Sequence, residues 1–229
     1  MTRFRPGFAM LLAALIAAAS VQAQVITPTG SFGSQPTMTF GGTGIPNAWV
    51  MTNSNASTLG VLLGLTATQR RTNPALTNNG AGTFFATPGL DVTTGAGPNY
   101  AMWNFDWFIG GANASQYSYR LYYDFDPAVG NTQANEGYIG FTKGFTGQNS
   151  WNLGMNFLTL ALPQAPAYAA FNPNAPGEYT FALVGLNDAG AEVARSAIAV
   201  DVVPEPASLT LLATGLVGLV SIRRKRRAS

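Results

Sequence analysis

The sequence predicts an all-β fold: an antiparallel β-sandwich over residues 24–203, preceded by a signal-peptide helix and followed by a single transmembrane helix. Charged residues are only 10% of the 229-residue chain, whereas Gly (26) and Pro (14) are frequent, and this composition favours short strands and turns. Aromatic and polar residues also alternate along several segments, which is the pattern of strands with one buried face. About 180 residues between the two ends are enough for one domain with its own core.

The strongest alternation lies in residues 102–110 and 117–125. The first segment places apolar residues on one face and polar residues on the other: Trp103, Phe105, Trp107 and Ile109 against Asn104 and Asp106. We expect these two strands to pair as a hairpin, with the bend at Gly110-Gly111-Ala112-Asn113.

Other segments give weaker signals. Weak edge strands are expected in 24–44, an exposed loop in 69–83, and further strands at 138–141 and 151–158. The apolar run 59–66 is a buried strand or a short helix, because periodicity does not separate the two.

The last unit of the domain has the clearest pattern. Tyr179, Phe181 and Leu183 face one way, residues 187–190 turn the chain, and 198–202 return as the final strand. This arrangement is similar to the closing hairpin of immunoglobulin-like sandwiches. The predicted sandwich is therefore immunoglobulin-like or jelly-roll-like, on fold-level analogy only.

The N-terminus has the order of a secretory signal peptide. Arg3 and Arg5 precede the apolar stretch 8–19, and small residues lead to a predicted cleavage between Ala23 and Gln24. A buried N-terminal helix is the alternative, but it leaves the order of charged, apolar and small residues unexplained. The sequence therefore predicts export of the rest of the chain.

The C-terminus consists of a Pro-Glu-Pro tripeptide, an apolar run and a basic cluster. The apolar run 207–222 has no charged residue and would reach about 24 Å as a helix, a minimal membrane span. Five cations follow it and predict a cytoplasmic stop-transfer end: Arg223, Arg224, Lys225, Arg226 and Arg227. The residues expected to form the processing motif stand just before the run: Val203, Pro204, Glu205 and Pro206.

This three-part tail, residues 204–229, resembles the PEP-CTERM sorting signal of Gram-negative bacteria. The resemblance implies recognition of the tripeptide by a membrane-embedded exosortase, which processes the tail during export to the cell surface or an exopolysaccharide matrix. It also implies an intermediate inserted in the inner membrane, after a signal peptidase has acted on the N-terminus. The alternative is an ordinary single-span anchor whose Pro-Glu-Pro is a juxtamembrane linker.

Charge and residue types exclude several classes of function. The segment 24–203 holds five cations and nine acids, a net charge of −4, so the basic pI of the whole chain arises from its two ends and indicates no nucleic-acid partner. The chain has no His and no Cys, which excludes Ser-His-Asp and Cys-His catalysis and the usual zinc sites. Paired carboxylates remain as the one enzymatic route, the basis of a carboxylate-dependent glycoside hydrolase.

Two binding sites can be named from the sequence. Asp124, Asp126 and Glu136 form a candidate calcium site, although their spacing departs from an EF-hand loop and Asx turns explain the same residues. No other cofactor is expected. Trp103, Trp107 and Tyr122 are candidate glycan contacts, and the alternative for the two tryptophans is burial in the core.

The sequence thus predicts an exported, non-enzymatic protein of the cell surface or matrix, in which the domain of residues 24–203 has a structural or adhesive role. A glycan-binding module of the matrix is the first alternative, and a carboxylate-dependent hydrolase is the second.

Overall fold

A computed structural model describes residues 24–42, 44–72, 74–161 and 170–204 of the chain. The predicted signal-peptide helix and the predicted transmembrane helix lie outside these residues. Within the described ranges, no helix is long and apolar enough to cross a membrane.

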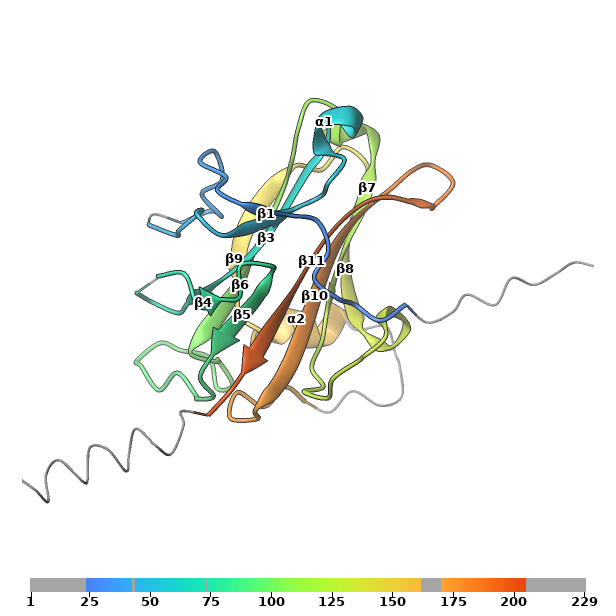
Figure 1. The fold of residues 1–229 in the computed structure, drawn as a ribbon. Helices are drawn as coiled ribbons and strands as arrows, with labels where there is room; N and C mark the ends of the chain where they lie inside the picture. The colour runs from blue at the N-terminus through green and yellow to red at the C-terminus, as the bar shows by residue number, and fades with distance from the viewer. Residues whose placement is uncertain (1–23, 43, 73, 162–169, 205–229) are drawn as a thin grey trace, which may run out of the picture.

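Two β-sheets make up most of the described structure (Figure 1). The first sheet has the order β1 (Ser31–Gly33), β2 (Val50–Thr52), β3 (Leu62–Gln69), β6 (Trp103–Gly110) and β9 (Gly147–Trp151). The second sheet has the order β4 (Thr77–Asn78), β5 (Thr83–Ala86), β11 (Glu192–Val202), β10 (Gly177–Leu186), β7 (Ser118–Tyr123) and β8 (Gly137–Phe141). The short helices are α1 (Ala56–Leu59), α2 (Asn156–Ala161), η1 (Ala114–Gln116) and η2 (Gln133–Asn135).

The inner faces of the two sheets share one core. Alternate residues of β3 and β6 in the first sheet, and of β7, β10 and β11 in the second, belong to the same buried apolar cluster. At its centre the rings of Phe105 and Phe181 stack with their centroids 4.5 Å apart, which joins the sheets directly. Because the side chains of a strand alternate between its faces, the odd-numbered residues of β6 and β10 point into this core.

The prediction of a mostly β fold is confirmed, and so is the closing hairpin. β10 and β11 pair in antiparallel register from Gly177 opposite Val202 to Leu186 opposite Glu192. One pairing departs from a purely antiparallel arrangement, because β5 runs parallel to β11, with Ala86 opposite Val202.

The predicted hairpin between residues 102–110 and 117–125 is wrong. β6 pairs with β3 and β9, whereas β7 pairs with β10 and β8, so consecutive strands lie in different sheets. The chain crosses between sheets through Gly111, whose φ of +107° is open to glycine and strained for other residues, and through η1. Each strand carries an aromatic face, and the two faces meet across the core instead of lying side by side in one sheet.

The predicted strand over 151–158 is also wrong. β9 ends at Trp151 and α2 begins at Asn156. Asn152 ends the strand, because its side-chain amide donates to the carbonyl oxygens of Ala101 and Trp103 at 2.9 and 2.7 Å. Its side-chain carbonyl accepts from the N–H of Gly154 at 3.1 Å and fixes a turn.

Smaller differences concern the segments around β3 and β8. Residues 137–141 form β8 as expected, and the ambiguous apolar run enters the buried strand β3 after α1. The expected loop at 69–83 contains the buried Leu76 and the short strand β4, which pairs with β5.

Candidate functional site

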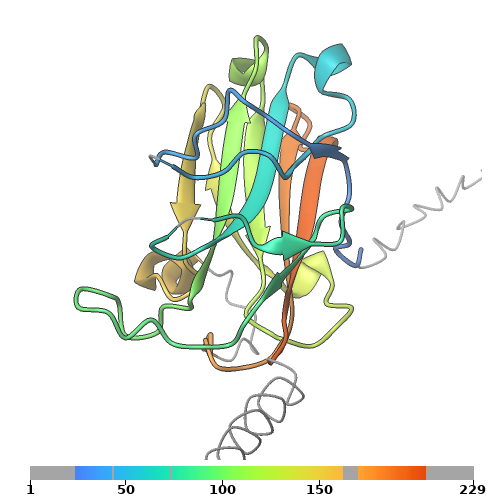
Figure 2. The same cartoon turned by 60° about the vertical axis from the view of Figure 1, so that its left-hand side comes forward.

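The end of β11 is the place where the domain meets the C-terminal tail. The N–H of Val203 donates to the carbonyl oxygen of Ala86 at 2.9 Å, so the parallel pairing with β5 holds the chain up to this residue. Val203 and Pro204 are exposed. Figure 2 shows that the chain leaves the domain at the end where β5 and β11 finish and where loops 87–102 and 124–136 gather.

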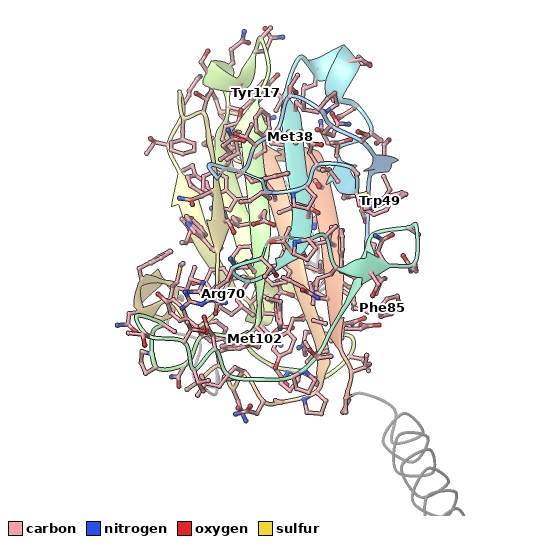
Figure 3. The ribbon with its side chains drawn as sticks, turned by 90° about the vertical axis from the view of Figure 1, so that its left-hand side faces the viewer. Met38, Trp49, Arg70, Phe85, Met102 and Tyr117 are labelled. Carbon is pink, nitrogen blue, oxygen red and sulfur yellow. The ribbon has the colours of Figure 1, made fainter. Side chains whose placement is uncertain are left out.

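A pocket of about 560 Å³ lies beside this exit. Its walls come from the end of β3, the following turn, β4, the end of β5 and the start of β6. They include Arg70, Arg71, Phe85, Ala86 and Met102. Figure 3 shows Arg70, Phe85 and Met102 on the face that looks toward the viewer. The carbonyl oxygen of Ala86 accepts from Val203, so the pocket wall and the tail exit share a residue.

The two arginines of this pocket share one buried carboxylate. The Nε–H groups of Arg70 and Arg71 both donate to Asp91 Oδ2, at 2.6 and 2.8 Å. The Arg70 guanidinium also lies 4.5 Å from the centre of the Tyr100 ring, within the range of a cation–π contact. Arg71 has a φ of +70°, an uncommon conformation for a residue with a side chain.

Hydrogen bonding keeps this carboxylate ionised. Burial alone would raise the pKa of Asp91, but hydrogen bonds from Thr93 and from the two arginines outweigh burial and hold its pKa well below the ordinary value. Two cations around one anion leave a local charge of +1 on the exit side of the domain. The Nε–H groups are used, so the terminal nitrogens of both guanidiniums are the groups able to meet an anionic ligand.

The three residues predicted to bind calcium lie near one another, but hydrogen bonds inside the protein use most of their oxygen atoms. Asp124 Oδ1 accepts from the N–H of Asp126 at 2.7 Å, and Asp124 Oδ2 accepts from Asn131 Nδ2 at 2.8 Å. Asp126 Oδ1 accepts from the N–H of Ala128 at 3.0 Å. The two bonds from backbone N–H groups are Asx turns. The described residues contain no group of three or more acidic, His or Cys side chains arranged to hold a metal ion.

Glu136 is buried beside this loop. Its Oε1 accepts from Thr180 Oγ1 at 2.9 Å, while its Oε2 has no hydrogen-bond partner among the described residues. Burial, together with repulsion from Asp124, raises the pKa of Glu136 to about 8, and burial raises the pKa of Asp124 to about 6. Glu136 is therefore protonated over much of the neutral range, and a protonated carboxyl is a poor calcium ligand.

The predicted glycan contacts lie in or against buried clusters. Trp103 and Trp107 are only 2% and 3% exposed and pack in the shared core, so their ring faces are covered. Tyr122 lies on the outer face of the second sheet, where it is buried against Tyr138, and its hydroxyl accepts from Arg120 at 3.3 Å. Trp103 and Trp107 are therefore core residues, as the alternative to a glycan contact predicted.

A different tryptophan is available to a ligand. Trp49 is 47% exposed and its ring stacks on Phe32, with centroids 6.0 Å apart and ring planes 19° apart. Phe32 in turn meets the buried Phe84 edge-on at 5.8 Å, so the exposed ring is supported from below. Figure 3 labels Trp49 at the edge of the domain. We call this exposed Trp49 ring, stacked on Phe32, the Trp49 platform. The sequence hardly predicts it, because Trp49 precedes a strand of only three residues in which polar and apolar residues do not alternate.

Asp106, another buried carboxylate, lies on the other side of the molecule. Asp106 is on the outer face of the first sheet, where Thr68 Oγ1 donates to its Oδ2 at 3.0 Å, and burial raises its pKa to about 7. Glu136 and Thr180 lie on the outer face of the second sheet. The shared core separates the two positions, so Asp106 does not pair with Asp124 or Glu136.

Comparisons with known proteins find one match, and it falls on the tail. Searches of curated proteins and of solved structures give no match. A family model described as the PEP-CTERM protein-sorting motif matches residues 202–227. The match begins at Val202, the last residue of β11, so the signal starts where the two-sheet domain ends. The chain therefore carries a PEP-CTERM sorting signal, which implies a protein sorted by an exosortase to the cell surface.

Proposed function

We propose that residues 24–203 form the cargo of this signal: a non-catalytic, structural or adhesive module of the cell surface or exopolysaccharide matrix of a Gram-negative bacterium. The chain passes through the inner membrane as an inserted intermediate, loses its signal peptide after Ala23, and is then processed at Pro204-Glu205-Pro206. The observation that carries the proposal is the junction at Val202 and Val203, where the last strand of the domain runs directly into the matched motif. Two packed sheets with a closing hairpin support an antiparallel β-sandwich, of immunoglobulin-like or jelly-roll-like type, as the cargo.

The positions of the acidic residues support a non-catalytic role. Retaining and inverting glycosidases need two carboxyl groups about 5–9 Å apart across a groove. Four pockets formed by described residues have volumes between 360 and 560 Å³, and none of these four is lined by Asp or Glu. Asp124 and Glu136 are instead buried under their own loop, with internal hydrogen-bond partners.

A glycan-binding module is the second candidate, and Trp49 is the observation that favours it. An exposed indole ring supported by Phe32 can stack on the C–H face of a sugar. In this proposal the platform replaces the buried Trp103 and Trp107 as the site of contact with the matrix.

Fractionation of cells tests the sorting proposal. In cells with the exosortase, the protein should appear at the surface or in the matrix without residues 207–229. In cells that lack the exosortase, the full tail should remain and the protein should stay with the inner membrane. Release of the same processed protein from both strains would contradict the proposal.

A further inference from the structure

The exposed apolar side chains of the domain gather at the end from which the tail leaves. The described residues include eight large apolar side chains that are exposed, and six of them belong to segments at this end: Phe85, Val92, Met102, Val129, Phe157 and Val203. Val92 and Val129 are 86% and 80% exposed, at the tips of loops 87–102 and 124–136. Exposed apolar side chains gathered in this way are unusual for loops that face water, and they mark a surface that contacts something else.

The opposite end is polar and provides the internal comparison. It consists of α1, the crossing at 110–117, and the turns 142–147 and 187–191. Among the described residues there, no large apolar side chain is exposed, and Lys143 forms an exposed ion pair with Asp188 at 2.6 Å. The apolar side chains therefore distinguish one end of the strands from the other.

The tail exit end also has two unlike sides. Figure 2 shows loops 87–102 and 124–136 on opposite sides of it. The side of loop 124–136 is acidic, with Asp126 and Glu178 both near Asp124. Asp201 lies opposite both Glu178 and Phe85 in the second sheet, so the acidic side extends as far as Phe85. The side of loop 87–102 carries the arginine pair with its single counter-charge, Asp91.

On this second side the apolar and basic groups are contiguous. Met102 lines the same pocket as Arg70 and Arg71. Arg70 lies over Tyr100, and Tyr100 lines a neighbouring pocket together with Phe157 of α2. We call the set of Val92, Met102 and Phe157, with the two arginines, the exit-side surface.

The length of the connecting chain limits how far this surface can be from a membrane. Val203 is still hydrogen-bonded to Ala86, so only residues 204–206 separate the domain from the apolar run that begins at Ala207. Three residues reach at most about 10 Å when extended. The polar layer on each side of a bilayer is itself about 5–8 Å thick. An inserted tail therefore brings the end of the domain to the level of the phospholipid headgroups.

We propose that the exit-side surface lies against the phospholipid surface of the membrane in which the tail is inserted, until the tail is processed. Val92, Met102 and Phe157 enter the interfacial layer, and the terminal nitrogens of Arg70 and Arg71 bind lipid phosphate groups. The acidic side with loop 124–136 is tilted away from the anionic headgroups. This inference rests on the proposed membrane-inserted intermediate.

The absence of cysteine from the chain allows a direct test with single labels. The full chain is reconstituted into phospholipid vesicles, and a fluorescent label is attached at Val92→Cys or, as the control at the polar end, at Ala189→Cys. Lipids carrying a quencher near the headgroup should quench the label at position 92 several-fold more than the label at 189. Protection of the tail from protease reports its insertion independently.

A second pair of variants separates surface contact from mere proximity. Phe157→Asp should reduce quenching of the label at 92 while tail insertion stays unchanged, whereas Val129→Asp on the acidic side should leave that quenching unchanged. Equal quenching at 92 and 189, with the tail inserted, would overturn the proposed surface and leave the sorting proposal intact. A tail that does not insert would overturn both.

Discussion

The N–H of Val203 donates to the carbonyl oxygen of Ala86 at 2.9 Å, one residue before the Pro-Glu-Pro tripeptide. This hydrogen bond extends the parallel pairing of β5 and β11 beyond the last residue of the strand. The sorting signal therefore follows the folded domain without a linker. In the proposed sorting, the enzyme that recognises the tripeptide works directly beside the two sheets, with the domain close to the membrane.

A short flexible insertion at this junction should give the enzyme more room between the domain and the tripeptide. Placing Gly-Ser-Gly-Ser between Val203 and Pro204 leaves the tripeptide, the apolar run and the basic cluster unchanged. We expect faster conversion to the processed form, measured by pulse-chase in cells with the exosortase. The control is the same insertion in the turn after Asp188, far from the junction. Slower conversion with the junction insertion would indicate that the enzyme uses the folded domain as part of its substrate.

The Phe105–Phe181 stack joins the two sheets, and its loss should destabilise the whole domain. Phe181→Ala removes a fully buried ring that also meets Trp103 at 6.2 Å. We expect a loss of about 3–5 kcal/mol in the free energy of unfolding, from lost burial and a residual cavity. Urea denaturation followed by tryptophan fluorescence measures the change. Val129→Ala, at an exposed position, should change the stability by less than about 0.5 kcal/mol, and a similar small effect for Phe181→Ala would contradict this core.

The buried carboxyl of Glu136 should make the stability of the domain depend on pH. Its pKa in the folded protein is about 8, above the ordinary value of 4.5, so the folded state binds the proton more tightly than the unfolded state. The stabilising contribution is complete below about pH 4 and is lost as the pH rises toward 8. The urea concentration at the midpoint of unfolding should therefore decrease as the pH is raised from 5 to 8.5.

Glu136→Gln is the matched variant for this pH dependence. The amide oxygen keeps the hydrogen bond from Thr180, and the side chain no longer titrates. The decrease with pH should become shallower, and the part that remains should include Asp106, whose pKa is raised to about 7. An unchanged slope in the Gln variant would mean that Glu136 is not protonated in the folded protein.

The residue pattern predicted strands well where the two faces of a strand differ. The closing hairpin follows from the alternation in 179–183 and 198–202, because one face meets the core and a turn of Asn, Asp and Gly connects the strands. The same alternation could not tell which strands are neighbours. β6 and β7 both have aromatic faces, and such faces fit equally well beside one another in one sheet or opposite one another across a core. Only the long-range pairing of β6 with β3 and of β7 with β10 decides between these arrangements.

The sorting signal could be read from the sequence because its three parts are contiguous. The pocket beside it could not, since Arg70 and Arg71 meet Asp91 only after the chain has passed through β4 and β5. Two adjacent arginines in a loop are also common on protein surfaces. Asp106 shows a different limit of the sequence pattern. It alternates with the apolar residues of β6, which predicts that it faces solvent, yet Asp106 is fully buried.

Loss of the Trp49 ring should weaken binding of the domain to a glycan. In pull-down assays with isolated exopolysaccharide, Trp49→Ala should weaken binding by about 10-fold or more, since a stacked aromatic ring contributes about 1–3 kcal/mol in comparable stacked contacts. Trp49→Phe keeps a ring on Phe32 and should retain part of the binding. The control is Phe157→Ala, an exposed aromatic at the tail end. Equal binding by the Ala variant and the unchanged protein would exclude the Trp49 platform.

A variant of Glu205 distinguishes a removable sorting signal from a permanent membrane anchor. Glu205→Ala leaves the hydrophobicity of 207–222 and the five following cations unchanged, so membrane insertion should be preserved. Processing should fall strongly because the central residue of the recognised tripeptide is missing. Intact-mass analysis of the protein from cells with the exosortase should show loss of residues 207–229 in the unchanged chain and retention of the tail in the variant. Replacing residues 223–227 with neutral residues is the complementary control, because it should disturb orientation in the membrane before any processing takes place. If the unchanged protein keeps residues 207–229 whether or not the exosortase is present, the apolar run is only an anchor.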